Sequence, residues 1–280
     1  MSHMLTGNNI GLITSRQTKD QWDALVSRYP IDHKALAAYD TNSLFPLYLY
    51  RTNKQTLFED HEPRDARGNR STNLNLAVIS DFATRLHLTF VPDGRGDLIK
   101  TFDPEAVFDY LYAGFHSPTY RSRYTEFLKI DFPRLPLTAN AELFRALCRL
   151  GKELVGLHLL EEHGPKITSY PIPGDNSVEV VRYNHPDQEA ERGRVWINRE
   201  QYFEGVPPEV WSFHVGGYQV CQKWLKDRKG RKLTYDDLTH YQQVVSALAK
   251  TIRLMAEIDE AIEDNGGWPI DASSLASDPA

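Results

Sequence analysis

The long apolar period near the C-terminus constrains the fold of this chain more than any other feature. Its apolar residues recur at intervals of three, four or seven, as they do along one face of an α-helix. They are Leu238, Tyr241, Val245, Leu248, Ile252, Met255 and Ile262. A continuous helix over 235–264 is roughly 45 Å long at 1.5 Å per residue. A helix with such a coiled-coil-like seam needs an apolar partner along its length, within this chain or in another part of a longer protein.

A second helical region precedes it, over residues 101–165. Asp103-Pro104-Glu105 predicts a helix start, because Asp is a favoured N-cap and proline is tolerated at the first helical position. A further helix is predicted over about 142–162, where leucines form the apolar stripe. Together with the segment between them, these helices are expected to pack as a small bundle.

The segment between these helices, residues 115–137, has two interpretations. Ser117 and Pro118 predict a helix start, and Tyr120 then leads an aromatic stripe flanked by Arg121 and Arg123. Capped N–H groups, aromatic rings and arginines in one short helix are what a dock for the phosphate backbone of a nucleic acid requires. The alternative is an ordinary amphipathic helix whose arginines pair with carboxylates.

Short strands are predicted on both sides of the helical region. Towards the N-terminus they cover 9–17, 23–28 and 45–50, with Pro46 at a sheet edge or strand start; a long polar loop over 51–71 and a helix over 74–88 follow. Beyond Gly164-Pro165, runs at 167–172, 177–183, 194–197 and 210–215 read as a β-rich module that ends in a helix over 218–228.

These elements predict an α+β fold: a helical bundle packed with a β-rich module and a long C-terminal helix. Residues 1–4, MSHM, are typical of an expression-tag remnant, and an α/β part over 5–100 follows. The helical part covers 101–165, the β-rich module with its basic helix 166–232, and the long helix 233–268. Residues 269–280 are polar and are expected to be disordered, and the chain is expected to be a piece of a longer protein.

Several enzyme classes are excluded by missing motifs. The sequence contains no G-x-x-x-x-G-K-[ST] nucleotide loop, no G-x-G-x-x-G at a strand-to-helix junction, no H-E-x-x-H and no G-x-S-x-G. His158 and His163 are five residues apart, which turns them to different faces of a helix, so neither a zinc site nor another metal site is expected. Asp32 and His33 are adjacent in sequence, and adjacent side chains seldom face each other, so they are not expected to form a catalytic pair. The chain is therefore expected to be non-catalytic by itself.

Charge is distributed unevenly along the chain. The net charge is −6, which argues against indiscriminate coating of nucleic acid. The run Gln222–Lys232 nevertheless carries a local charge of +5, from Lys223, Lys226, Arg228, Lys229, Arg231 and Lys232 against Asp227. This run is either a phosphate-binding surface or a solvated helix end whose cations favour the helix dipole.

A second basic zone lies at 182–199. Besides Arg199 at its end, it contains the candidate base-reading residues Arg182, Asn184, Arg192, Arg194 and Asn198. Arginine and asparagine make bidentate contacts to guanine and adenine edges, and they are equally common in hairpin turns.

The cellular setting is predicted from two further features. Cys148 and Cys221 both lie in apolar helical patterns, so buried free thiols are expected rather than a disulfide. No apolar run is long enough to span a membrane, and no secretory signal leads the chain. We therefore expect a reducing, cytoplasmic setting with no membrane partner.

Four strings, in this order, carry a resemblance to a known family. They are FPLYLY, LYAGFHSPTYRSRYTEFLKIDFPRLPL, ELFRALCRLGKELVGLHLLE and GGYQVCQKWLKDRKGRKLTYDDLTHYQQVVSALAKTIRLMAEID. Over residues 9–264 the chain resembles the C-terminal specificity region of Type ISP restriction–modification enzymes. These are single chains that combine a nuclease, a helicase-like ATPase, an adenine methyltransferase and a target-recognition part.

The resemblance implies a target-recognition domain for double-stranded DNA. It implies a second partner, the methyltransferase domain of the parent chain, and places S-adenosylmethionine, ATP and Mg in upstream domains; no cofactor is expected in this chain. The family's N-P-P-Y and Walker motifs are missing here, so no catalytic residue can be assigned. It favours Arg121 and Arg123 as phosphate contacts, with Ser117 and Tyr120 beside them, and leaves both interpretations of the basic run open.

Two other functions are compatible with the residues. One is a shorter DNA adenine methyltransferase or nuclease fragment whose active site has an unfamiliar pattern. The other is a non-catalytic adaptor that binds a protein partner through the long C-terminal helix.

Overall fold

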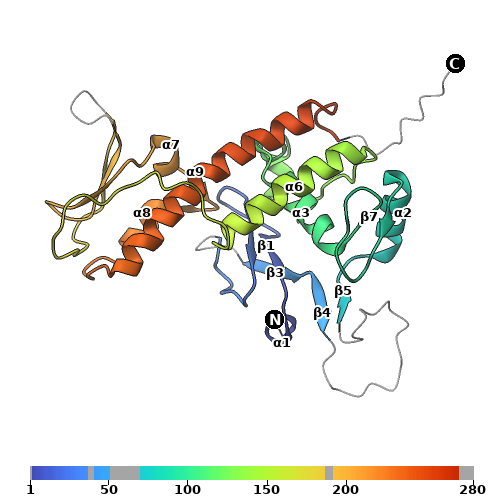
Figure 1. Cartoon of the computed structure of the whole chain (residues 1–280), viewed down its shortest axis with the longest axis horizontal. Helices are drawn as coiled ribbons and strands as arrows, with labels where there is room; N and C mark the ends of the chain where they lie inside the picture. Colours follow the sequence, from blue (N-terminus) through green and yellow to red (C-terminus); the bar gives the residue numbers. More distant parts are fainter. Residues whose placement is uncertain (1, 37–40, 51–69, 187–191, 271–280) are drawn as a thin grey trace. The chain divides into compact units, whose positions relative to one another are not determined.

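The computed structural model describes residues 2–36, 41–50, 70–186 and 192–270 (Figure 1). Contacts divide the chain into two compact units: unit 1 comprises 1–155 and 255–280, and unit 2 comprises 156–254. The helices α6 (Ala141–His158) and α9 (Tyr235–Glu263) each contribute residues to both units. The predicted α+β class is confirmed, because several small sheets accompany these helices.

Unit 1 begins with α1 (His3–Thr6) and a three-stranded antiparallel sheet. β1 (Gly11–Ser15) lies between β2 (Ala24–Ser27) and β3 (Asn42–Pro46), which confirms the first two predicted strands. The predicted strand over 45–50 is two strands: β3 ends at Pro46, and β4 (Tyr48–Tyr50) pairs with β5 (Arg70–Thr72). Proline lacks the N–H that a ladder needs, so Pro46 ends an edge strand as expected. Of the predicted polar loop, 51–69 lies outside the described residues.

Two helices of unit 1 begin at side-chain caps; the Asp103 cap was predicted and the Asn75 cap was not. Asp103 accepts a hydrogen bond from the amide of Ala106 and caps α3 (Pro104–Phe115), and Asn75 caps α2 (Leu76–Leu86). Between them, β6 (Thr89–Phe90) and β7 (Thr101–Phe102) form a parallel pair. Phe82, Phe102 and Phe144 pack edge to face at centroid distances of 5.3–5.8 Å and bring α2, β7 and α6 into one core. Of residues 269–280, which were expected to form a disordered tail, Ile270 is buried, and 271–280 lie outside the described residues.

The close packing of α3 on α6 determines the environment of Asp109. A Cβ at Gly151 would overlap the backbone carbonyl of Asp109, so α6 approaches α3 directly at this point. Burial therefore raises the pKa of the Asp109 carboxyl from its ordinary value of 3.8 to about 8, although Lys152 opposes the shift.

Because folding favours the protonated Asp109 carboxyl, its effect on stability depends on pH. The wild-type chain is expected to lose stability as the pH rises from about 4 to about 8, over which the folded state holds a proton that the unfolded state releases. Asp109→Asn is expected to remove this loss and to raise the free energy of unfolding by about 5 kcal/mol at pH 9, since burial raises the pKa from 3.8 to about 8. Urea titrations between pH 5 and 9 would measure it.

Asp97 provides a control of opposite sign. Its carboxylate accepts the amides of Lys100, Thr101 and Ile99, which hold its pKa well below the ordinary value. Its stabilising effect is present at neutral pH and is lost only as the pH falls through its folded pKa, so Asp97→Asn should destabilise the chain at pH 7. Equal pH profiles for Asp109→Asn and the wild type would contradict the assignment.

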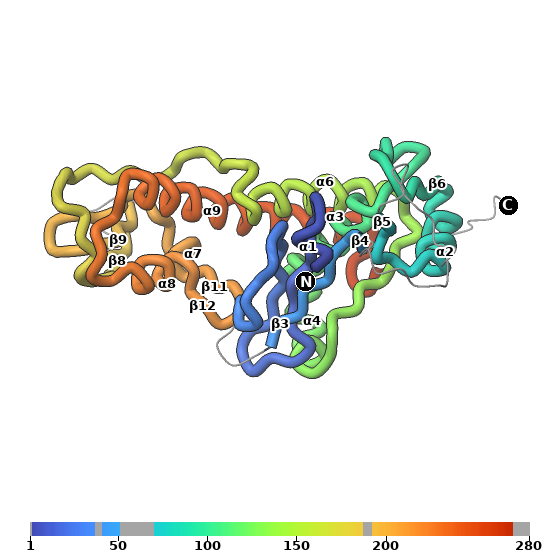
Figure 2. Tube along the Cα trace, turned by 90° about the horizontal axis from the view of Figure 1, so that it is seen from below, coloured from blue at the N-terminus to red at the C-terminus, as the bar shows by residue number. Residues whose placement is uncertain are grey.

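Unit 2 is built on a three-stranded antiparallel sheet with the order β10-β9-β8. Figure 2 labels β8 and β9 of this sheet. The strands are β8 (Arg182–Asn184), β9 (Arg194–Trp196) and β10 (Tyr202–Glu204). A hairpin of β11 (His214–Val215) and β12 (Tyr218–Gln219) leads into α8 (Val220–Lys226). The strand predicted over 210–215 is wrong at its start, because Pro207 and Pro208 begin the short helix α7 (Pro208–Trp211) there. Both cysteines are free and buried, as predicted.

The long helix α9 is confirmed. Thr234 and Asp237 form a capping box, in which the Asp237 carboxylate accepts the Thr234 amide at 2.9 Å and the Thr234 hydroxyl accepts the Asp237 amide at 3.1 Å. Tyr241 and Val245 are fully buried in the core of unit 2, with Val195, Phe203 and Leu225 among their neighbours. Ile258 and Ile262, further along α9, are buried within unit 1. The chain therefore supplies the apolar partner that the seam requires.

Candidate nucleic-acid interface

The predicted dock at 115–137 is an interior structure of unit 1. Its helix is interrupted at Tyr124 and forms two short helices, α4 (Pro118–Arg123) and α5 (Thr125–Leu128). The Ser117 hydroxyl caps α4 by accepting the Tyr120 amide at 3.0 Å, donates to Asp259, and accepts the indole N–H of Trp268 at 3.1 Å. Ser117 is fully buried, so its predicted contact with a phosphate is wrong.

Arg121 is held inside unit 1 by two groups. Its Nη2 donates to the Asp23 carboxylate at 2.6 Å, and its Nε donates to the carbonyl oxygen of Phe115 at 2.6 Å. The side chains of Arg121 and Asp23 are 11% and 3% exposed. Tyr120 is buried too, and its hydroxyl donates to the carbonyl oxygen of Arg134 at 3.0 Å. The predicted phosphate contacts of Arg121 and Tyr120 are therefore wrong; of this group, only Arg123 is on the surface.

The basic run in unit 2 divides into paired and unpaired cations. Lys223 pairs with Asp227 at 2.7 Å and Lys232 lies 3.7 Å from Asp175. Arg228 stacks on the Trp224 ring at 3.5 Å and lies 3.6 Å from Asp237. These three cations therefore have a role within the fold.

The other three cations of the run are exposed and, among the described residues, form no ion pair: Lys226, Lys229 and Arg231. Lys226 donates to the uncharged Gln222 side chain at 2.7 Å. We call Lys226, Lys229 and Arg231 the basic turn. Gly230 at its centre has φ of +80°, a conformation that favours glycine.

The basic turn is attached to the three-stranded sheet by backbone hydrogen bonds. The amide of Gly230 donates to the carbonyl oxygen of Val178 at 2.8 Å. The amide of Val178 donates to the carbonyl oxygen of Arg231 at 2.9 Å. One residue on, the amide of Glu179 donates to the carbonyl of Ile197, directly after β9, at 2.7 Å. The turn and the sheet are thus held in a defined relation.

The two faces of the sheet differ in chemistry. Register places Tyr183, Val195 and Phe203 side by side, and Val195 and Phe203 are fully buried in the core. Alternation along each strand turns the remaining side chains to the opposite face. We call this the outer face; its two rows are Arg182, Trp196 and Tyr202, and Asn184, Arg194 and Glu204.

Contacts on the outer face hold its aromatic rings and one arginine. The Trp196 and Tyr202 rings are 4.6 Å apart between centroids, and the Arg182 guanidinium lies 5.5 Å from the Trp196 ring. Arg194 donates to the Glu204 carboxylate through Nε at 3.0 Å and Nη2 at 2.8 Å. Arg182 and Asn184 remain exposed.

The structure therefore brings together three of the five residues predicted to read bases: Arg182, Asn184 and Arg194. Arg192 is exposed just before β9. The prediction for Asn198 is wrong, because it is buried: its amide donates to Ser177 and Gln201, and its oxygen accepts the Gln201 backbone amide at 2.7 Å.

Trp196, Tyr202 and Glu204 complete the outer face and were missed from the sequence. The signal was the alternation of polar or aromatic and apolar residues in RVW and YFE. These strands have three residues each, which is too short for the alternation to stand out without their partners.

The described ranges contain neither a metal-ligand cluster nor a membrane-spanning helix. No group of three or more histidine, cysteine, aspartate or glutamate side chains is arranged to hold a metal ion there. In the same ranges, no helix is both long enough and apolar enough to cross a membrane.

Comparisons with known proteins agree with this architecture. The family model of the Type ISP C-terminal specificity domain matches residues 1–257. No match was found among the curated proteins.

Three solved structures have the same fold. The ATP-dependent Type ISP restriction-modification enzyme LlaBIII bound to DNA has a TM-score of 0.63 and 19% identity, over 90% of this chain and 16% of that chain. A DrdV–DNA complex has a TM-score of 0.65 and 17% identity, over 91% and 25%. A nuclease-deletion mutant of the Type ISP restriction-modification enzyme LlaGI with a DNA substrate mimic has a TM-score of 0.55 and 19% identity, over 92% and 21%. This chain thus spans a quarter or less of each of these proteins.

Proposed function

From the premise that this chain belongs to the family of Type ISP C-terminal specificity domains, we propose that it recognises a short sequence of double-stranded DNA for a larger restriction–modification enzyme. The observation that supports this most is the outer face of the unit 2 sheet. It presents Arg182 and Asn184 to solvent and is linked to the basic turn by backbone hydrogen bonds.

The outer face supplies the base contacts in this proposal. A small β-sheet can enter the major groove, where arginine donates two hydrogen bonds to guanine and asparagine pairs with adenine. Arg182 and Asn184 have these chemistries and lie at the two ends of β8. The rings of Trp196 and Tyr202 contact each other, and the Arg182 guanidinium lies over the Trp196 ring, so these rings hold Arg182 in place.

The pair of Arg194 and Glu204 adds discrimination. The Nε and Nη2 groups of Arg194 donate to Glu204 and hold the guanidinium in a fixed direction. Because the guanidinium is already ordered, less conformational entropy is lost when its remaining donors contact a base. The Glu204 carboxylate repels phosphates and can accept a hydrogen bond from the amino group of cytosine. This row therefore suits base edges better than the phosphate backbone.

The basic turn supplies the sequence-independent contacts. Lys226, Lys229 and Arg231 have no carboxylate partner within the described part of unit 2, so binding a phosphate breaks no ion pair there. Phosphate contacts of this kind fix the register of a protein on a duplex and leave the choice of sequence to the base contacts.

Chemistry belongs to other parts of the parent protein in this proposal. The methyltransferase, with S-adenosylmethionine, would act on an adenine flipped out of the duplex, and the ATP- and Mg-dependent steps would lie elsewhere in the same protein. This chain is then non-catalytic by itself and determines where the other parts act. The adaptor alternative is less well supported, because residues of the α9 seam such as Tyr241 and Ile258 are buried within the chain.

Selection from a pool of random duplexes tests the proposal. The chain is expected to enrich a short motif, and Arg182→Ala is expected to relax the choice at one position at a cost of about 1–3 kcal/mol. Arg199→Ala is the matched control, since Arg199 is exposed beside the sheet in the turn after β9 and should leave the motif unchanged. A pool without any enriched motif would refute the proposal, and calorimetric binding of S-adenosylmethionine by this chain would favour the methyltransferase alternative.

A further inference from the structure

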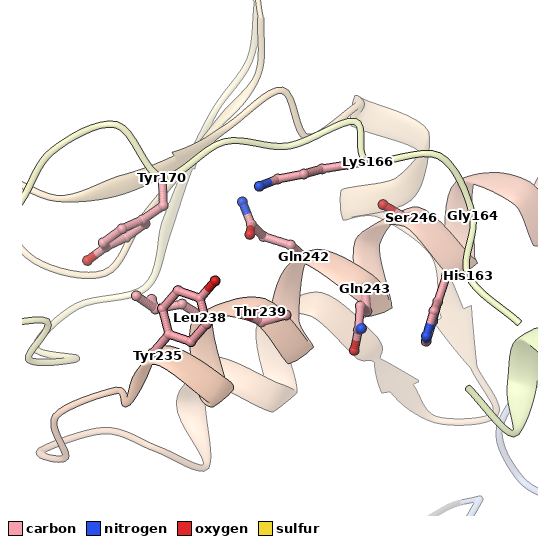
Figure 3. A pocket seen from close by; sticks show the side chains of 10 residues that line it. All are labelled: His163, Gly164, Lys166, Tyr170, Tyr235, Leu238, Thr239, Gln242, Gln243 and Ser246. Atoms are coloured by element: carbon pink, nitrogen blue, oxygen red, sulfur yellow. The ribbon is translucent and has the colours of Figure 1, made fainter. Parts of the chain in front are cut away.

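A groove of about 450 Å³ runs along the first half of α9 in unit 2 (Figure 3). One wall is the face of α9, and the other is the segment from His163 to Tyr170 that leads into the β-rich module. The lining includes Lys166, Thr239, Gln242, Gln243 and Ser246.

The groove follows from the two-faced character of α9. Tyr241 and Val245 point into the core of unit 2. Thr239, Gln242 and Ser246 recur at helical spacing on another face and form the polar wall.

The opposite wall is fixed by two close approaches to α9. A Cβ at Gly164 would lie 2.8 Å from the carbonyl oxygen of Ser246, so only glycine allows the chain so near the helix. The side-chain amide of Gln242 donates to the carbonyl of Thr168 at 3.0 Å. The groove is therefore a defined part of unit 2.

The lining is rich in hydrogen-bond donors. None of the ten lining residues is acidic, whereas Lys166 and His163 supply nitrogen donors and Lys166 extends towards Gln242 in Figure 3. The carboxylates nearest in sequence lie at both walls: Glu161 and Glu162 precede His163 and are exposed, and Asp236 and Asp237 are at the start of α9. Asp237 is engaged by Thr234 and Arg228, and Asp236 is exposed. Lysine, tyrosine, threonine, serine and glutamine are the side chains that contact phosphates and sugars in protein–DNA complexes.

We propose that this groove binds the sugar–phosphate backbone of duplex DNA, as a second clamp beside the basic turn. The inference rests on the proposed DNA-recognition function and adds a site to it. Tyr235, at one end of the groove, follows Arg231 of the basic turn by four residues, so at most about 14 Å of chain separates the two Cα atoms. The groove and the basic turn can therefore contact the same stretch of DNA backbone.

Two substitutions test the groove without enlarging any side chain. Gln243→Glu places a negative charge in it and is expected to weaken DNA binding by about tenfold through repulsion of the phosphate. Lys166→Gln is expected to reduce the slope of log K against log salt by about 0.9, the value for one phosphate contact. Ethylation interference on the bound duplex should show that Lys166→Gln loses contact with one phosphate. Variants of the basic turn should retain that contact.

Matched controls make the same changes on the surface of unit 1. Gln17→Glu and Lys100→Gln alter exposed residues outside the groove and should leave affinity and slope unchanged. If the wild-type chain binds no DNA, the proposed function fails and the groove proposal with it. If the wild type binds DNA while Gln243→Glu and Lys166→Gln behave like their controls, the groove proposal alone is overturned.

Discussion

Arg121→Met is expected to lower the free energy of unfolding of unit 1 by about 3–5 kcal/mol, the usual cost of removing one partner of a buried ion pair. The substitution leaves the Asp23 carboxylate, which is 3% exposed, without its guanidinium. It also leaves the carbonyl of Phe115 without the Nε donor. Urea denaturation followed by tryptophan fluorescence would report the loss, because Trp22 and Trp268 both lie in unit 1.

Arg134→Met is the matched control for this measurement. Arg134 pairs with Asp131 at 3.0 Å, but its side chain is 88% exposed, and such surface pairs contribute at most about 1 kcal/mol. Adding Asp23→Asn to Arg121→Met should recover part of the lost stability, since no buried charge then remains. Equal stabilities for Arg121→Met and Arg134→Met would contradict the interior role and return Arg121 to the list of possible phosphate contacts.

The second large effect is expected in DNA binding. The double variant Lys226→Gln/Lys229→Gln should reduce the slope of log K against log salt by about 1.8, since each lost phosphate contact changes it by about 0.9. Relative to 1 M salt, that difference corresponds to a loss of affinity of about 60-fold at 0.1 M. Fluorescence anisotropy titrations of a labelled duplex over a series of salt concentrations would measure both quantities.

The control removes the same number of positive charges from unit 1. Lys34 and Lys100 are exposed there, and Lys34→Gln/Lys100→Gln should leave the slope close to that of the wild type. If the two double variants lose affinity equally, the effect is one of net charge and the basic turn has no special role. Together with the random-duplex selection, this comparison separates phosphate contacts from base contacts.

Local structure was largely predictable from the sequence because its causes are local. Asp103-Pro104 begins α3, Thr234 and Asp237 cap α9, and Pro46 ends an edge strand, all through residues within one turn or one ladder position. Prediction failed where an apolar run was assigned without regard to the residues before it. Val210 was assigned to a strand, although the two prolines that precede it begin a helix.

The candidate interface shows the limit of such reasoning. Ser117, Tyr120 and Arg121 have the composition of a phosphate dock, and Arg182, Asn184 and Arg194 have that of base readers, in equally short stretches of sequence. Only the fold separates them. Arg121 meets Asp23 across 98 residues of sequence, whereas Arg182 and Asn184 remain on the exposed face of a sheet.

The sequence by itself determined the helical seam, the caps, the buried thiols and the positions of the basic runs, because each depends on spacing along the chain. The tertiary structure decided which cations are free to meet a phosphate and which are structural. That choice depends on whether a carboxylate distant in sequence, such as Asp23, comes within hydrogen-bond distance of the cation, and on how far the site is removed from water. Coulombic pairing and burial are properties of distances in space, and spacing along the chain does not specify them.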